Sequence, residues 1–138
     1  ASQQYLSGIL LHIIGMIFSI SKNKEFEKDN VAEKMEQAKI IMNENVCKEI
    51  DPEELAEKLN IRYSWFRKTL KKYTGYSPAK YFQELKLRKA KQILINTSYP
   101  VKEICFMIGY TSTEHFSNLF KKNTGLTPLE YRSFGKDE

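Results

Sequence analysis

The residues best suited to chemistry lie between Gly109 and Arg132, and the chemistry that they support is hydrogen bonding rather than catalysis. Phe116 and Phe120 are four residues apart, so a helix would place both on one face. The opposite face would carry hydrogen-bonding side chains, namely Thr113, Glu114, Ser117 and Asn118. A pair of lysines would close the helix, where cations suit the negative end of its dipole. This pattern is typical of a helix that reads bases in the major groove of DNA.

A second copy of this pattern lies fifty residues upstream. The sequence of residues 71–81, KKYTGYSPAKY, recurs in residues 121–131 as KKNTGLTPLEY, and Phe66 and Leu70 occupy the positions of the two phenylalanines. Further upstream the offset is forty-nine, so the second copy has one more residue in its turn. The positions paired there are Leu55, Ala56, Leu59 and Ile61 with Ile104, Cys105, Ile108 and Tyr110. Two short helices joined by a brief turn form a helix-turn-helix unit, and the chain is predicted to hold two in tandem.

Capping residues and glycine stops determine where the helices that position these side chains begin and end. Asp51 and Pro52 start the first unit, with Glu54 placed to close a capping box, and Gly75 and Gly125 supply left-handed stops. The predicted bounds are about 51–75 for the first unit, about 78–96 for a long linker helix and about 100–125 for the second unit. They lie in a domain of residues 31–138, preceded by residues 1–30, an apolar helix and a charged connector. The predicted fold class is all-α.

Lysines and arginines dominate the middle of the chain. The whole chain has 22 basic and 17 acidic residues, but ten basic residues lie between Arg62 and Lys91, where Glu84 is the one acid. This excess favours a polyanionic partner, although a solvated lysine-rich face would have the same composition. The inward side of the linker helix is predicted to hold Tyr81, Leu85, Ala90, Ile93 and Leu94. Its outward side is predicted to hold Lys80, Lys86, Lys89 and Lys91.

Enzymatic chemistry is not indicated by the residue pattern. Two histidines and scattered acids form no metal-ligand spacing, no nucleophile–base pair and no phosphate loop. We therefore expect no catalytic residue, no metal and no cofactor. Cys47 and Cys105 lie in apolar, helix-like contexts, which predicts reduced core thiols in a cytoplasmic protein. RNA binding is disfavoured because the sequence has no aromatic platform or RNA-module motif.

An apolar helix is predicted near the N-terminus, between Leu6 and Ile20. Its apolar residues are spaced like the seam of a coiled coil, at Leu6, Leu10, Ile13, Ile17 and Ile20. We expect a homodimer formed through this helix or through a missing N-terminal domain onto which the helix docks. A helix folded onto its own domain is an alternative. A membrane segment is a weaker one, because the run is shorter than the roughly twenty residues of a span, and no membrane is expected.

With these residues in view, the chain resembles the AraC/XylS family of bacterial transcription regulators, specifically its C-terminal DNA-binding domain. The resemblance covers roughly Val31 to Phe134. It is carried by Ile104-Cys105, Gly109-Tyr110, Phe116, Phe120-Lys121-Lys122, Gly125, Pro128 and Tyr131-Arg132. It implies seven helices, sequence-specific binding of double-stranded DNA and regulation of transcription, with RNA polymerase as a further candidate partner. The family typically attaches a sensor or dimerisation domain N-terminal to this one.

The resemblance also implies which residues contact DNA, and the helical-face argument selects the same recognition faces. The base-contacting positions are Ser64, Arg67, Lys68, Thr113, Glu114, Ser117 and Asn118. The positions expected at phosphates are Arg62, Tyr63, Lys71, Lys72, Ser112, Lys121 and Lys122. Arg62 stands where the family usually has a small capping hydroxyl. Arg67 could donate to guanine or to phosphate. Glu114 could accept from cytosine, or it could be a first-turn carboxylate that interacts favourably with the positive end of the helix dipole.

Two recognition helices joined by a rigid linker helix could enter successive major grooves about 34 Å apart and bend the DNA. Two alternatives stay open. The fragment could bind DNA with little specificity of its own, dimerisation or a missing domain supplying the rest. It could also be a protein-interaction module, which would have acidic or apolar residues on the recognition faces.

Overall fold

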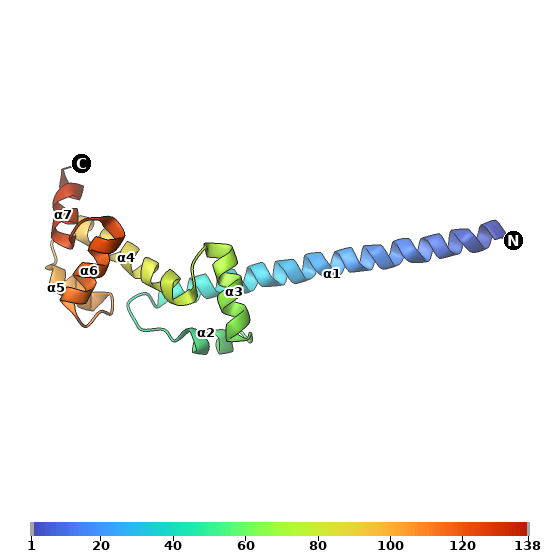
Figure 1. The fold of residues 1–138 in the computed structure, drawn as a ribbon, viewed down its shortest axis with the longest axis horizontal. Coiled ribbons are helices and arrows are strands. Elements are labelled where there is room, and N and C mark those ends of the chain that lie inside the picture. The colour runs from blue at the N-terminus through green and yellow to red at the C-terminus, as the bar shows by residue number, and fades with distance from the viewer. Residues whose placement is uncertain (1, 138) are drawn as a thin grey trace. The chain divides into compact units, whose positions relative to one another are not determined.

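The computed structural model describes the backbone of residues 2–137 and the side chains of residues 6–23 and 28–137. Over this range every regular element is a helix (Figure 1). The helices are α1 (Ser2–Glu44), α2 (Pro52–Lys58), α3 (Tyr63–Thr74), α4 (Pro78–Asn96), α5 (Val101–Met107), α6 (Thr113–Thr124) and α7 (Pro128–Lys136). The predicted all-α fold is confirmed, with helix-turn-helix units α2–α3 and α5–α6 joined by the long helix α4.

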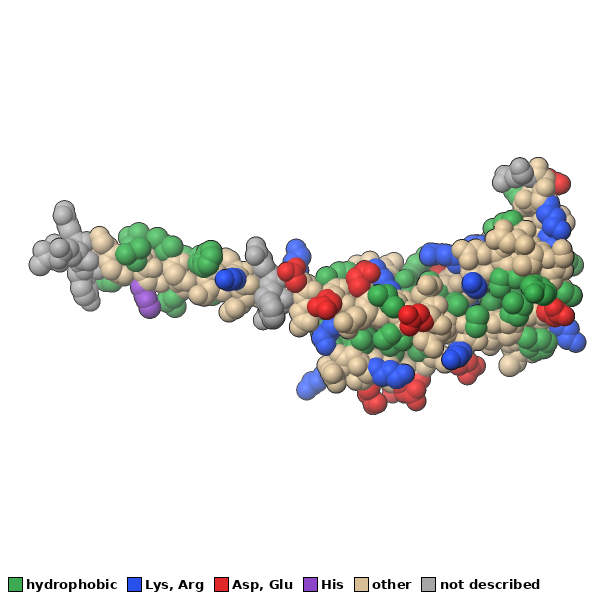
Figure 2. Space-filling model, turned by 180° about the vertical axis from the view of Figure 1, so that it is seen from behind, with side chains coloured by type: hydrophobic (Ala, Val, Ile, Leu, Met, Phe, Trp, Pro, Cys, Tyr) green, Lys and Arg blue, Asp and Glu red, His purple; other side chains and the backbone are tan. Residues whose placement is uncertain are grey.

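The chain divides into two compact regions, residues 1–37 and residues 38–138. The first consists of most of α1, whose apolar side chains from Leu6 to Ile20 are exposed (Figure 2). The stretch predicted as a charged connector is helical and continues α1, and its side chains at 24–27 lie outside the described residues. By length and composition α1 could cross a membrane, a property that signal sequences and core helices share, so it is weak evidence for membrane insertion.

Within residues 38–138, α4 is the helix on which both helix-turn-helix units pack. It contacts α3 on one side of its midpoint and α5 and α7 on the other (Figure 1). Phe82 and Leu85 are buried in the first half of α4. The second half contributes to a core whose buried members are Leu87, Ala90, Leu94, Ile104, Cys105, Ile108, Phe116 and Phe120. Phe82 and Leu87 are also inward residues of α4, in addition to the predicted set.

The helix ends follow local sequence signals. The Asp51 carboxylate accepts from the Glu53 amide at 3.0 Å, and Ser77 caps α4 through the Lys80 amide at 3.4 Å. Glu54, predicted to close a capping box, lies on the exposed side of α2. The capping box forms instead at Thr127 and Glu130 of α7, with both amide-to-side-chain distances 3.2 Å.

The two recognition helices end in the same way, which shows that the sequence repeat is a structural one. The Thr74 hydroxyl donates to the Leu70 carbonyl at 2.7 Å, and the Tyr76 amide donates back to Thr74 Oγ1 at 3.1 Å. At the end of α6 the corresponding distances around Thr124 are 2.8 and 3.2 Å. Each helix then stops at a glycine with positive φ, as predicted.

Two expectations about burial are wrong. Lys86, predicted on the outward side of α4, is only 6% exposed. It lies between Leu85 and Leu87, and its ammonium donates to backbone carbonyls. Cys47, predicted as a core thiol, is exposed, whereas Cys105 is buried. Cys47 follows the end of α1, so the helical spacing that would have turned it inward no longer applies there.

The turns inside the two helix-turn-helix units have different residues at one left-handed position. Asn60 has φ 56° in the first turn and Gly109 has φ 85° in the second. A Cβ at Gly109 would lie 2.9 Å from Lys86 Nζ and 3.0 Å from the Cys47 carbonyl oxygen. The second turn therefore needs glycine for space as well as for its backbone conformation.

Replacing Gly109 with alanine should destabilise the domain more than the same change at Gly125. Gly125 has a similar φ of 82° but no heavy atom within 4 Å of its added Cβ, so it measures the conformational cost alone. We expect Gly109→Ala to lower the free energy of unfolding by about 1–3 kcal/mol more, which is the usual cost of overpacking. Urea unfolding of both variants measures the difference, and equal losses would contradict the crowding described at Gly109.

Tyr110 predicts a pH dependence of stability. Burial, with a smaller effect of Cys105, raises the pKa of the Tyr110 phenol from its ordinary 10.0 to about 12. The unfolded chain would lose this proton first, so the stability that Tyr110 contributes is complete below about pH 10 and lost as the pH rises towards 12. Tyr110→Phe should therefore lose less stability than the parent between about pH 10 and about pH 12. Parallel urea titrations test this, and identical losses would show that the phenol ionises equally in both states.

Candidate DNA-binding interface

The orientation of α3 is set by Phe66 and Leu70, which are fully buried. Because these side chains point inward, Ser64, Arg67 and Lys68 are left on the exposed side of the same helix. The structure thus brings the three predicted base-contacting residues of the first unit onto one exposed face. That face carries two cations and a hydroxyl, which can donate to guanine and to phosphate oxygens.

The orientation of α6 is set by a run of aromatic contacts. The Phe116 ring centroid lies 5.5 Å from that of Tyr110 and 5.8 Å from that of Phe120, which meets Tyr131 edge-on at 5.3 Å. Aromatic pairs at such distances add to the stabilisation gained by burial. With its phenylalanines fully buried, α6 cannot rotate about its axis without opening the core that they form with the second half of α4 and with α5.

The predicted base-contacting residues of α6 are not equally accessible. Glu114 and Asn118 are exposed, whereas Thr113 and Ser117 are half-buried. Thr113 is also hydrogen-bonded to the side chain of Cys105, and burial raises the pKa of that thiol more strongly than this bond lowers it. The α6 face therefore offers an amide and a carboxylate most freely, the groups that suit adenine and cytosine.

The residues expected at phosphates surround these two faces. Lys71 and Lys72 are exposed in the last turn of α3, as are Lys121 and Lys122 in the last turn of α6. Arg62 is the N-cap of α3 but makes no capping hydrogen bond, so its exposed side chain is available to an anion. The remaining two predicted residues are Tyr63, which is half-buried, and Ser112, which caps α6 through the His115 amide at 3.2 Å.

The two faces differ in charge. The exposed face of α3 carries Arg67 and Lys68, whereas that of α6 carries Glu114 and the neutral Asn118. The first unit therefore favours acceptor-rich guanine edges and phosphates, and the second favours bases that present donors. Trp65 and His115 occupy equivalent positions beside the buried phenylalanines, and both are exposed, Trp65 at 37%.

Sequence reasoning missed the role of Arg132 in positioning the second unit. Arg132 Nε donates to the Leu94 carbonyl at 3.0 Å, and its Nη2 donates to the Tyr99 carbonyl at 2.5 Å. It thereby holds the break between α4 and α5 and fixes the approach to the second helix-turn-helix unit. An arginine directly after Tyr131, four residues after Pro128, was the available signal.

Metal chemistry has no site in the described part of the chain. Among those residues, no group of three histidine, cysteine or acidic side chains lies close enough to hold a metal ion. Both cysteines are free. The arrangement that the structure builds is a hydrogen-bonding and electrostatic surface.

Comparisons with known proteins agree with this geometry. The helix-turn-helix domain family matches residues 55–133. The HTH-type transcriptional regulator GbdR of Pseudomonas aeruginosa is 31% identical over 99 residues, covering 72% of this chain and 27% of that protein. The HTH-type transcriptional activator RhaS of Salmonella schwarzengrund is 30% identical over 104 residues, covering 75% of this chain and 37% of its own length. The chain thus spans about a third of these curated relatives.

A solved structure shows the same fold. The crystal structure of a transcriptional regulator with an AraC-type DNA-binding domain from Chromobacterium violaceum matches with a TM-score of 0.72 and 28% identity. The match covers 75% of this chain and 93% of that one. From the two helix-turn-helix units, the family match and this structure together, the chain belongs to the AraC family of helix-turn-helix transcription regulators.

Proposed function

We propose that this chain binds double-stranded DNA in a sequence-specific manner, with α3 and α6 in successive major grooves, and thereby regulates transcription in the bacterial cytoplasm. One observation carries this proposal. The same capped recognition helix occurs twice, on either side of the midpoint of α4, each time with its apolar pair buried and its hydrogen-bonding face exposed.

The length of α4 supports the engagement of two grooves. Its 19 residues correspond to about 28 Å of helix at 1.5 Å per residue. Successive major grooves on one side of B-DNA are about 34 Å apart. Because the linker helix is shorter than that distance, DNA bending towards the protein would help both helices to reach their grooves.

A second arrangement is favoured by the exposed apolar side chains of α1. In it, one domain alone has little specificity, and a homodimer formed between Leu6 and Ile20, or a further domain, supplies the rest. A protein-interaction module without DNA binding is disfavoured, because Arg67, Lys68 and Asn118 keep the recognition faces polar and competent for bases. RNA polymerase is a further proposed partner.

Selection from a randomised pool of double-stranded DNA, followed by sequencing, tests the function. At two salt concentrations we expect one enriched site with two elements about one helical turn apart. Phosphate contacts alone would instead enrich no sequence and lose binding at the higher salt concentration. That second outcome would overturn the proposal that this domain reads sequence by itself.

Arg67→Ala should weaken binding to the selected site by about 1–3 kcal/mol and relax the preference at one or two base pairs. The reason is that a guanidinium can donate two hydrogen bonds to one guanine. Repeating the selection with the variant measures the preference. A preference that stays unchanged while affinity falls would place Arg67 on a phosphate.

Lys121→Ala is the matched control for Arg67→Ala, since it also removes one exposed cation from a recognition helix. It should weaken binding to all sequences alike and reduce the slope of log affinity against log salt by about one. A loss restricted to one sequence would assign Lys121 to a base.

A further inference from the structure

Lys86 is a buried cation near the middle of α4. Its Nζ donates to the carbonyl oxygens of Val46 at 2.9 Å, Lys48 at 2.9 Å and Ile108 at 2.7 Å. An ammonium group has three donors and no acceptor, so these three bonds use its full capacity. Bonds from a charged donor are stronger than neutral ones, and leaving such a group unpaired in a buried position is costly.

The three carbonyls belong to segments that are far apart in the sequence. Val46 and Lys48 lie in the stretch that leads from α1 into the first helix-turn-helix unit, and Ile108 is the C-cap of α5, at the turn of the second unit. Lys86 itself belongs to the helix that joins the units. One side chain therefore connects the approach to the first unit with the turn of the second.

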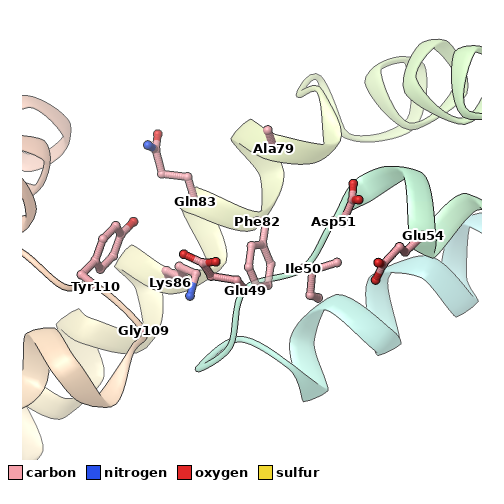
Figure 3. A pocket seen from close by; sticks show the side chains of 10 residues that line it. All are labelled: Glu49, Ile50, Asp51, Glu54, Ala79, Phe82, Gln83, Lys86, Gly109 and Tyr110. Carbon is pink, nitrogen blue, oxygen red and sulfur yellow. The ribbon is translucent and has the colours of Figure 1, made fainter.

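The surroundings of Lys86 are built for a cation. The Phe82 ring centroid lies 4.8 Å from the ammonium and that of Tyr110 lies 5.6 Å away, on either side of Lys86 in Figure 3. Burial lowers the pKa of Lys86, while Cys47 and Glu49 oppose this effect. Gly109 leaves the space in which Lys86 Nζ and the Cys47 carbonyl approach the second turn.

Among the described residues, the two helix-turn-helix units are joined mainly through α4. Among the larger helix–helix contacts of the described residues, none joins α2 or α3 directly to α5 or α6. Both units depend on α4, and a single helix can bend and twist about its axis. The hydrogen bonds of Lys86 lie to one side of that axis, so they oppose both motions.

We propose that Lys86 is a positioning residue that fixes the first helix-turn-helix unit relative to the second and so sets the spacing of DNA elements that the domain accepts. Lys86 is buried and acts through backbone groups rather than on DNA. Two binding elements held in the right relative position bind with a higher effective concentration than two loosely linked ones. That Lys86 fixes the two helix-turn-helix units is argued from the geometry alone, whereas its effect on DNA spacing rests on the proposed function.

The first test measures the distance between the units without DNA. Spin labels on Glu57→Cys in α2 and Glu103→Cys in α5, both exposed, report this distance in a Cys47→Ser, Cys105→Ala background. Lys86→Met removes the cation and keeps the chain length, and we expect a broader or shifted distance distribution in the folded protein. An unchanged distribution would overturn the proposal. If Lys86 only stabilised the fold, its removal would lower the melting temperature without changing the distance between the two helix-turn-helix units.

Three further variants make the outcome unambiguous. Lys89→Met removes an exposed lysine from the same helix and should leave the distribution unchanged. Lys86→Arg keeps the cation and should preserve the narrow distribution, because a hollow of about 490 Å³ adjoins the site and leaves room for the larger head group. If Lys86→Met does not fold, Lys86→Gln takes its place, since its amide keeps two donors but loses the charge.

The second test uses the two DNA elements obtained by selection, with spacers changed by about half a helical turn. The parent should discriminate strongly between spacings. In Lys86→Met the ratio of the affinities for the preferred and the altered spacing should fall roughly tenfold, as expected for lost charge-assisted bonds. The affinity for a single element should stay unchanged. Unchanged discrimination with a moved distance distribution would refute the DNA consequence alone. If the parent selects no site with two elements, the proposed function fails, and the distance measurement still decides the role of Lys86.

Discussion

Burial of one pair of side chains, four residues apart, decides what each recognition helix can present. Phe66 and Leu70 in α3, and Phe116 and Phe120 in α6, are fully removed from solvent. Exposing either pair would cost several kcal/mol of apolar burial, which is comparable with the whole stability of a small domain. Because a helix has one register, fixing its inward face fixes its outward face as well. The hydrogen-bonding surface is therefore a consequence of core packing.

The repeat is a repeat of this packing and not of the chemistry on the surface. Thr74 and Thr124 end the two recognition helices with the same hydrogen bonds, yet the exposed face of α3 is cationic and that of α6 carries a carboxylate and an amide. The turns differ too, because the left-handed position is an exposed asparagine, Asn60, in the first turn, whereas Gly109 in the second turn is crowded by Lys86 and the Cys47 carbonyl. Among the described residues, Lys86 is the one buried charged side chain, so no similar group serves the first turn.

Features that depend on neighbouring residues were predictable from the sequence. The starts at Pro52, Pro78 and Pro128 and the glycine stops of α3 and α6 follow from backbone chemistry within one turn of helix. The buried pairs follow from helical periodicity, and with them the exposed faces. Features that depend on distant segments were not predictable. The burial of Lys86 requires three carbonyls that lie 22 to 40 residues away, and no local pattern distinguishes it from the solvated lysines of α4.

The separation of inward and outward residues on α3 and α6 has a consequence for how such a domain can change over evolution. Within the described residues, the side chains of Ser64, Arg67 and Asn118 are exposed and take part in none of the side-chain hydrogen bonds or ion pairs that hold the domain together. Substitutions at exposed positions of this kind usually alter stability by less than about half a kcal/mol. New target sequences can therefore be acquired by mutation of these positions while the fold is nearly neutral to the change. The domain can diverge in what it recognises much faster than in how it folds.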